Sequence, residues 1–254
     1  MTGTAFDFGG KVALVTGGSR GLGESIAGAL AQRDARVVIC GRKQENLDDA
    51  IKRFREMGLE VIGNVANVGH PDQVEAMLEM VEAQFGRLDI LVNNVGMNIL
   101  TPSVVEAEET LWDKIIQTNL RGTFLVTKAG VRLMKKSGGG KVINVSSIAA
   151  RKAVPGMGIY CVAKAGVDML TRVLAVELAR DKIQVNGVAP CMIKTPFSKP
   201  FWSNEGLLKQ ITQAIPMGRI AETGDVVGAV LFLASGFSDF ITGEVLTVDG
   251  GSMA

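Results

Sequence analysis

The only tyrosine of this chain, Tyr160, is followed four residues later by a lysine, Lys164. Four residues span about one helical turn, so the phenol and the ammonium share a helix face. An ammonium beside a phenol favours the phenolate, and we expect it to lower the tyrosine pKa from ~10 toward the working pH. Such a tyrosine can act as a general acid or base. Ser147, thirteen residues upstream, is a candidate for the same site.

A glycine-rich turn near the N-terminus is the second chemical signal. The apolar run Val12–Thr16 leads into the turn Gly17-Gly18-Ser19-Arg20-Gly21-Leu22-Gly23, which opens a helical pattern. Glycines allow a sharp turn and a close approach of backbone to a pyrophosphate, whose charge favours a helix N-terminus. The spacing departs from the usual dinucleotide fingerprint, Gly-x-Gly-x-x-Gly. Its position after the first predicted strand nevertheless indicates a dinucleotide site.

The end of the second predicted strand bears on which dinucleotide is bound. NAD-binding chains usually place an acid there, about 20 residues beyond the glycines, to hold the ribose hydroxyls. The stretch Val38–Lys43 contains no acid, and the first one is Glu45. Arg42 and Arg20 are suited to pair with a 2′-phosphate, although a solvated Arg42 is the alternative. The pattern therefore favours NADP(H).

The overall charge and hydropathy exclude several classes of partner. A formal net charge of +1 gives no field that would attract a nucleic acid or an anionic membrane. No apolar run reaches the length of a membrane span, and residues 1–10 lack the basic start and apolar core of a signal peptide. We therefore expect a cytoplasmic protein.

Scarce residue types exclude further chemistries. The three cysteines, Cys40, Cys161 and Cys191, have neither metal-binding nor disulfide spacing, so free buried thiols are expected. The only histidine, His70, precedes Pro-Asp, which resembles a helix start. Ser-His-Asp hydrolysis and a metal site are therefore not expected.

Short apolar runs alternate with amphipathic stretches along the whole chain. The predicted strands are Lys11–Thr16, Arg36–Cys40, Glu60–Val65, Asp89–Asn93, Lys141–Ser146, Gln184–Ala189 and Val245–Val248. The predicted helices are Gly21–Arg33, Gln44–Met57, Pro71–Phe85, Glu108–Lys136, Gly158–Arg180 and Thr223–Ser235. This alternation predicts an α/β fold, a doubly wound parallel sheet with helices on both faces. Since no linker or repeat interrupts the pattern, we predict one domain over residues 1–254.

Two segments suggest how a substrate and a second copy of the chain could bind. The connection Lys194–Met217 is unusually long and apolar, and it follows the carboxyl end of a strand, where ligands of open α/β sheets bind. We interpret it as a lid over an apolar substrate; an ordinary packed excursion is the alternative. The helix Tyr160–Ala179 is apolar nearly all round, which favours burial against a copy of itself.

Taken together, these motifs resemble the short-chain dehydrogenase/reductase family over essentially the full length. The matching segments are Thr16–Gly23, Asn93–Gly96, Asn119, Ser146–Ser147, Tyr160–Lys164, Pro190–Thr195 and Thr247–Gly251. The resemblance implies a seven-stranded Rossmann sheet, a homotetramer, and NAD(P)(H)-dependent interconversion of an alcohol and a carbonyl.

The resemblance also implies a role for each matching residue. Tyr160 would donate the proton, Lys164 would lower its pKa and hold the nicotinamide ribose, and Ser147 would orient the carbonyl. Asn119 would anchor a water that links Lys164 to solvent. The implied cofactor contacts are Gly17, Ser19, Arg20, Gly21, Leu22, Gly23, Arg42, Asn67, Asn94, Gly96, Tyr160, Lys164, Pro190, Ile193 and Thr195.

Three positions depart from the family pattern. Val95 replaces a usual alanine, and Asn67 stands where an Asp commonly faces the adenine amino group. Cys191 replaces a glycine beside the nicotinamide. A side chain there intrudes on the substrate pocket, which affects the choice of substrate but not the hydride chemistry.

We therefore predict NADPH-dependent reduction of an apolar ketone or dicarbonyl. Arg42–Gln44 and Ile193–Ser198 resemble the dicarbonyl/retinol reductases and, less closely, the tropinone reductases. A 3-oxoacyl-carrier-protein reductase is the alternative enzyme; Arg132, Lys135 and Lys136 would then help to bind an acidic carrier. A non-enzymatic alternative is a protein that binds the dinucleotide as a sensor or scaffold, but such proteins typically lose the tyrosine or the lysine. The sequence leaves open the substrate, the stereochemistry and the direction of the reaction.

Overall fold

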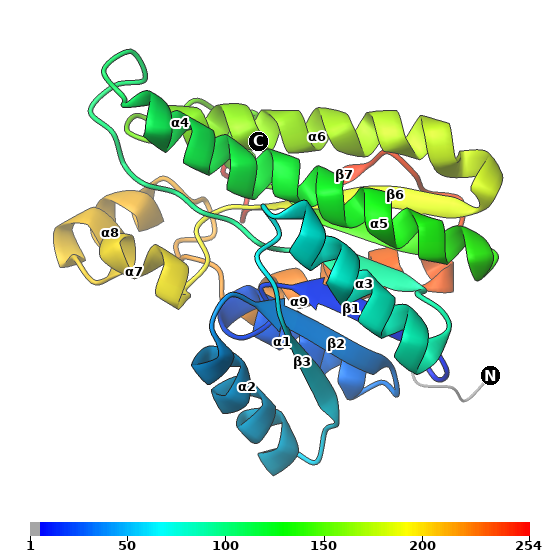
Figure 1. The fold of residues 1–254 in the computed structure, drawn as a ribbon. Coiled ribbons are helices and arrows are strands. Elements are labelled where there is room, and N and C mark those ends of the chain that lie inside the picture. The colour runs from blue at the N-terminus through cyan, green and yellow to red at the C-terminus, as the bar shows by residue number, and fades with distance from the viewer. Residues whose placement is uncertain (1–5) are drawn as a thin grey trace.

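A seven-stranded, entirely parallel sheet forms the centre of the molecule in the computed structural model, which describes residues 6–254 (Figure 1). The order is β3-β2-β1-β4-β5-β6-β7, and each strand pairs in parallel with its neighbours. The strands are β1 Val12–Thr16, β2 Arg36–Gly41, β3 Val61–Val65, β4 Ile90–Asn93, β5 Gly140–Val145, β6 Ile183–Pro190 and β7 Val245–Val248. The predicted fold class is confirmed.

Helices cover both faces of this sheet, and each face has its own apolar core. One core joins α1 (Gly21–Ala31), α2 (Gln44–Glu56) and α9 (Thr223–Ala234) to the sheet. The other joins α3 (Pro71–Phe85), α5 (Gly122–Lys136) and α6 (Gly158–Leu178). The strands are rich in Val and Ile because both of their faces are buried. The chain order reverses between β1 and β4, and ligands of such sheets bind at this switch point.

The predicted helix over residues 108–136 is interrupted. α4 (Glu109–Ile116) passes into a π-helical turn, Gln117–Arg121, before α5 begins. A π-helical turn shifts the backbone hydrogen bonds by one residue and is frequent at functional sites. Here it contains Asn119, and the hydroxyl of Thr123 donates to the Asn119 carbonyl over 2.8 Å. The amphipathic pattern continues through the turn, so it gave no sign of the interruption.

The long apolar connection contains two short helices that the sequence did not predict, α7 (Lys199–Trp202) and α8 (Glu205–Gln213). They lie beyond the carboxyl ends of the strands, at the left of Figure 1. Asn204 caps α8 through its side chain, and the Trp202 indole donates to the Thr195 carbonyl over 3.0 Å. These bonds order the segment against the end of β6.

The remaining helical turns are short 3₁₀ turns. They are η2 Ile148–Ala150, η3 Ala179–Asp181, η4 Pro196–Ser198 and η5 Gly236–Ser238. His70 is the N-cap residue of α3, as its place before Pro-Asp predicted. Within residues 6–254, no helix has the length and apolar character that a bilayer crossing requires.

Candidate active site

The glycine-rich turn joins β1 to α1 and leaves no room for side chains at two positions. A Cβ at Gly18 would lie 2.4 Å from Cγ2 of Ile39, and one at Gly23 would lie 2.3 Å from the Gly17 carbonyl oxygen. Gly17 and Gly21 have positive φ angles of 65° and 58°, which L side chains rarely adopt. The glycines are thus required for the sharp turn and for the close packing of helix against strand.

The N-terminus of α1 emerges directly from this turn. Its N-cap residue, Arg20, makes no side-chain capping bond, and the first N–H groups of a helix have no partner within the helix. The N–H groups of Gly21, Leu22 and Gly23 therefore remain suited to bind an anion, assisted by the helix dipole. This arrangement fits the pyrophosphate of a dinucleotide.

The side chains of Asn94 and Thr16 form hydrogen bonds that connect the turn to the end of β4. Nδ2 of Asn94 donates to the carbonyls of Thr16 (3.0 Å) and Gly17 (3.2 Å). The Thr16 hydroxyl accepts the backbone N–H of Asn94 at 2.9 Å and that of Val95 at 3.3 Å. Asn94, which the sequence assigned to the adenine-ribose side, thus acts on the shape of the turn itself.

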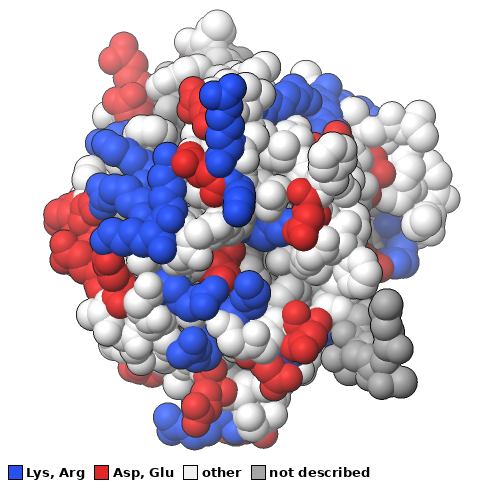
Figure 2. Space-filling model, turned by 90° about the vertical axis from the view of Figure 1, so that its right-hand side faces the viewer, with Lys and Arg blue, Asp and Glu red and all other residues white. Residues whose placement is uncertain are grey.

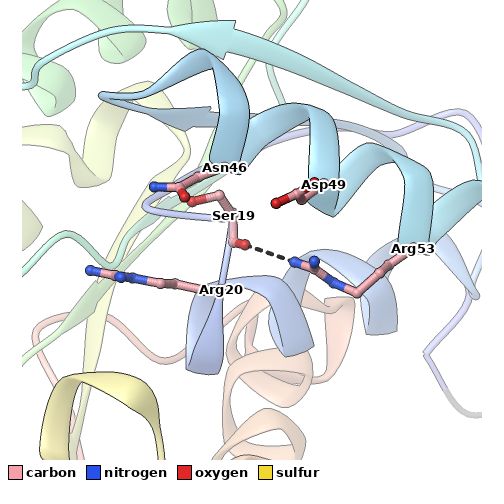
Figure 3. A pocket seen from close by; sticks show the side chains of 5 residues that line it. All are labelled: Ser19, Arg20, Asn46, Asp49 and Arg53. Atoms are coloured by element: carbon pink, nitrogen blue, oxygen red, sulfur yellow. Dashed lines mark hydrogen bonds between the residues drawn. The ribbon is translucent and has the colours of Figure 1, made fainter.

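A polar cavity of about 170 Å³ opens beside the turn and is lined by Ser19, Arg20, Asn46, Asp49 and Arg53 (Figure 3). Arg42 is exposed just after β2. At the end of β2, a Cβ at Gly41 would stand 3.4 Å from the Ser19 hydroxyl. The glycine turn and the end of β2 therefore meet, as a site for the adenosine ribose requires.

Arg53 is a residue that the sequence analysis missed. From α2 its Nη2 donates to the Ser19 carbonyl at 3.1 Å, and its Nε binds Glu24 at 2.6 Å. These bonds connect α2 to the turn and to the first turn of α1. No local motif marks this arginine, because its partners lie 34 and 29 residues away in the chain.

Tyr160 and Lys164 lie one turn apart on α6, and both are buried. Lys164 Nζ lies 5.6 Å from the centroid of the tyrosine ring and donates to the Val145 carbonyl at 2.7 Å. The sequence prediction of a lowered tyrosine pKa is wrong. Burial raises the Tyr160 pKa to about 12, against an opposing hydrogen bond from Ser147.

Burial acts on the lysine in the opposite direction and lowers the Lys164 pKa to about 8, while nearby Asp168 opposes this shift. Desolvation disfavours whichever form is charged, so it stabilises the neutral phenol and the neutral amine. At neutral pH the phenol keeps its proton and the lysine keeps most of its charge. That combination suits a tyrosine that donates a proton.

Ser147 and Asn119 reach the same place from other elements. Ser147 follows β5, caps η2, and accepts the Ala149 N–H at 3.1 Å. Asn119 is fully buried and binds both backbone groups of Met97, through Oδ1 at 3.0 Å and Nδ2 at 2.8 Å. A Cβ at Gly96 would stand 3.4 Å from Asn119 Oδ1 and 3.8 Å from Lys164 Nζ. The missing side chain of Gly96 therefore leaves space between these two polar groups.

The predicted nicotinamide side lies after β6. Pro190 ends the strand, Ile193 bridges to Ala221, and Thr195 begins η4. The Thr195 Cβ lies 3.3 Å from where a Cβ of Gly21 would stand, so the segment after β6 reaches the glycine turn. The nicotinamide side of the expected cofactor site thus adjoins its pyrophosphate side.

Two of the positions that depart from the family pattern, Asn67 and Cys191, have different surroundings. Asn67 Oδ1 accepts the Gly69 N–H at 3.1 Å, so it helps to shape the loop after β3. All three cysteines are free, but only Cys40 is buried; Cys161 and Cys191 are half-buried. The prediction of buried thiols is therefore wrong for those two, because each side chain remains partly exposed to solvent. Burial still raises the Cys191 pKa.

The chain matches known proteins over nearly its whole length. A family model described as "Enoyl-(Acyl carrier protein) reductase" matches residues 17–253. "Dehydrogenase/reductase SDR family member 4" of Sus scrofa is 41% identical over 242 residues, which cover 95% of this chain and 87% of that protein. A tropinone reductase homolog of Arabidopsis thaliana is 38% identical over 244 residues, covering 96% of this chain and 90% of the homolog.

A solved structure gives the same result for the fold. Gluconate 5-dehydrogenase from Burkholderia cenocepacia, crystallised with NADP and tartrate, superposes with a TM-score of 0.93 at 36% identity. The match covers 97% of this chain and 96% of that one. The whole architecture is therefore shared, including the elements that carry the site.

Proposed function

Because the chain belongs to the short-chain dehydrogenase/reductase family, whose members are oxidoreductases that bind a nicotinamide dinucleotide, we propose that it reduces an apolar ketone or dicarbonyl with NADPH. The observation that carries the proposal is the meeting of Tyr160, Lys164, Ser147 and Asn119 beside the glycine turn. We assign cofactor binding mainly to residues 1–150 and the substrate lid to residues 194–217.

The bound dinucleotide would supply the hydride, and the residues of this chain would manage the charge on the carbonyl oxygen. Ser147 would orient that oxygen through its hydroxyl, and Tyr160 would donate a proton to it. The buried Lys164 ammonium would stabilise the phenolate left behind and would hold the ribose. Donors fixed at an atom that becomes negative stabilise the transition state more than the ground state.

A raised tyrosine pKa keeps the phenol protonated but also makes it a weaker acid, so the Lys164 charge must stabilise the phenolate as the proton leaves. A phenol with a pKa of about 12 is fully protonated at pH 7, so it is ready to donate. In the oxidation direction the same group must first lose that proton.

Apolar side chains at the mouth of the site support an apolar substrate. Met192 and Phe197 follow the nicotinamide side, with Phe197 48% exposed. Ile99 and Leu100, in the loop after β4, are 41% and 54% exposed. A substrate that covers these side chains gains roughly 25 cal/mol for each Å² of apolar surface removed from water.

We expect kcat/KM to be at least ~10-fold higher for aromatic and long-chain ketones than for 2-oxo acids, the oxidised forms of small hydroxy acids. A difference of this size requires about 1.4 kcal/mol of differential binding. The measurement is a panel of ketones, dicarbonyls and 2-oxo acids under identical conditions. Phe197→Ser should lower this ratio without changing the rate for the smallest ketone. An enzyme that prefers the anionic substrates would contradict the apolar assignment.

A reductase acting on an acyl carrier protein is the second candidate, favoured by the description of the matching family model. The basic residues expected to bind such a carrier are already paired: Arg132 with Glu75, Lys135 with Asp181, and Lys136 with Glu82. Figure 2 shows Lys and Arg groups on one face with Asp and Glu beside them. This pairing favours a free small ketone over an acidic protein.

An apolar stripe on α6 supports assembly of two or more copies. Val162, Met169, Val173 and Val176 recur at helical spacing and are 48%, 55%, 44% and 81% exposed. Such a stripe on a helix that already packs on its own sheet is typical of a surface that needs a second partner. We propose a dimer through α6 and, with a second interface, a homotetramer.

Met169→Glu combined with Val176→Glu is expected to yield a folded monomer. Both side chains point away from the subunit, so their charge should destabilise the interface rather than the fold. Sedimentation at micromolar concentration is the measurement, and Met57→Glu, on an exposed residue at the end of α2, is the control. A parent protein that sediments as a monomer would refute the proposed assembly.

A further inference from the structure

A buried carboxylate, Asp168, lies one helical turn beyond Lys164 on α6 and is only 5% exposed. Ser146 donates a hydrogen bond to one of its oxygens. The Nε of Arg151 donates to the other oxygen at 3.1 Å. The carboxylate therefore has a partner on each oxygen, and both partners come from the loop that carries Ser147.

Arg151 extends this network to the last strand of the sheet. Its Nη1 donates to the Thr247 hydroxyl at 2.8 Å, and its Nη2 donates to the Val245 carbonyl at 2.9 Å. One guanidinium thus connects the loop after β5, the helix α6 and the edge strand β7. Its side chain is 31% exposed, so most of it is enclosed by these partners.

The geometry bears directly on the candidate active site. Ser147 adjoins Ser146, and Lys164 adjoins Asp168 across one helical turn. Displacement of the carboxylate would therefore loosen the Ser147 loop from α6. The carboxylate also lies near the Lys164 ammonium, and an opposite charge favours the ionised lysine against the cost of burial.

We propose that Asp168 is a positioning residue for the reductase reaction: its carboxylate binds Ser146 and Arg151 to hold Ser147 beside Tyr160, and its charge keeps Lys164 protonated. The inference rests on the proposed roles of Tyr160, Ser147 and Lys164. Asp168 itself touches neither substrate nor cofactor in this assignment. Its effect passes through its neighbours.

Few other charged or titratable groups face Lys164. α6 itself brings Tyr160, Cys161 and Asp168, and η2 is followed by Arg151. The strand β6 beneath the helix contains no titratable side chain. Arg121, in the π-helical turn, binds the Gly69 carbonyl. The ionisable side chains of α4 are Glu109, Asp113 and Lys114. β5, whose Val145 carbonyl accepts from Lys164, contains one, Lys141 near its start. Among these groups, Asp168 is the one whose charge raises the Lys164 pKa.

The test is the pH dependence of the reduction rate in Asp168→Asn, a variant of nearly the same shape. Without the carboxylate, Lys164 should lose its proton at lower pH. The alkaline limb of the kcat profile should therefore move down by about one pH unit, the lower end of the effect of a nearby opposite charge. The rate should fall about tenfold at pH 9 and change little at pH 6.5 beyond a uniform loss.

Arg151→Met provides the opposite charge change in the same network. It keeps the carboxylate and removes its cationic partner, so the alkaline limb should move to higher pH, while kcat falls uniformly because the Ser147 loop loosens. General damage to the fold would not move the two limbs in opposite directions. Limbs that stay in place in both variants, or that move in the same direction, would overturn the proposal.

Asp89→Asn is the matched control, because Asp89 is another buried carboxylate, held by Arg87 Nε at 2.8 Å and by the Val12 N–H at 2.9 Å. It lies just before β4, at the opposite end of the strands from the site. It should lower stability without moving the pH profile.

Tyr160→Phe separates the proposed mechanism from the proposed role of Asp168. If that variant keeps full activity, the proposed role of Tyr160 as proton donor fails, and with it the mechanism on which this inference rests. If it is inactive and the Asp168 variant keeps the parent profile, only the role of Asp168 fails.

Discussion

Replacing Tyr160 with Phe is expected to lower turnover by ~10²–10⁴, the range for the loss of one general acid. The phenol is the only tyrosine hydroxyl in the chain, and its high pKa keeps it protonated at neutral pH. Phenylalanine fills the same buried space, so the fold and the glycine turn should not change. The measurements are kcat for a good ketone and the dissociation constant of NADPH by fluorescence.

The control for this prediction is the adjacent, half-buried Cys161. Cys161→Ser changes a neighbouring polar group on the same helix but removes no proposed proton donor, so it should retain most of the activity. A Tyr160→Phe enzyme that reduces ketones at the parent rate would show that another group donates the proton. Weakened NADPH binding in the same variant would instead assign Tyr160 to the cofactor.

A preference for NADPH over NADH of ~10–100-fold or more in kcat/KM is the second expected result. A guanidinium forms charge-assisted hydrogen bonds with a phosphate, and each such bond contributes ~1.5–3 kcal/mol, equivalent to ~10–100-fold in affinity. Arg20 lines the cavity beside the turn, and Arg42 is exposed just after β2. The stretch Val38–Lys43 at the end of β2 contains no acid that would repel the phosphate, and Asp49, which also lines the cavity, comes from α2.

Gly41→Asp combined with Arg42→Leu should shift the preference toward NADH. A Cβ at Gly41 would meet its nearest neighbours, Leu47 and the Ser19 hydroxyl, at 3.4 Å, which is ordinary contact. The new carboxylate would face the ribose hydroxyls and repel a 2′-phosphate. Arg36→Leu is the control, since it removes an exposed arginine at the other end of β2. A parent enzyme that prefers NADH would show that Arg42 is merely solvated.

The strands were predictable because their signal is local. Val- and Ile-rich runs such as Val12–Thr16 are buried on both faces, and the structure moves their limits by only a residue or so. The helices of the segment 194–217 were not predictable in the same way. α7 has only four residues, and Pro196 and Pro200 suggest a loop. The interruption at Asn119 was missed because Gln117–Arg121 contains no proline or glycine that would mark a break in the helix.

The candidate site was predictable where its members are close in sequence. The pair Tyr160 and Lys164 follows from helical spacing alone, whereas the direction of the tyrosine pKa shift does not. Spacing reports which groups are neighbours, but the depth of burial decides which protonation state is stable. Arg53 and Asp168 were missed for a related reason. Each acts through partners that only the tertiary structure brings to it.

The contact between Arg151 and Thr247 has a consequence for synthesis of the chain on the ribosome. The two residues are 96 positions apart, which at 5–20 residues per second corresponds to about 5–20 s of translation. The nascent chain therefore carries its tyrosine, lysine and serine well before the strand that holds their loop exists. A ribosome that stalls within this interval would display the proposed cofactor-binding half without the strand that completes the proposed reaction centre.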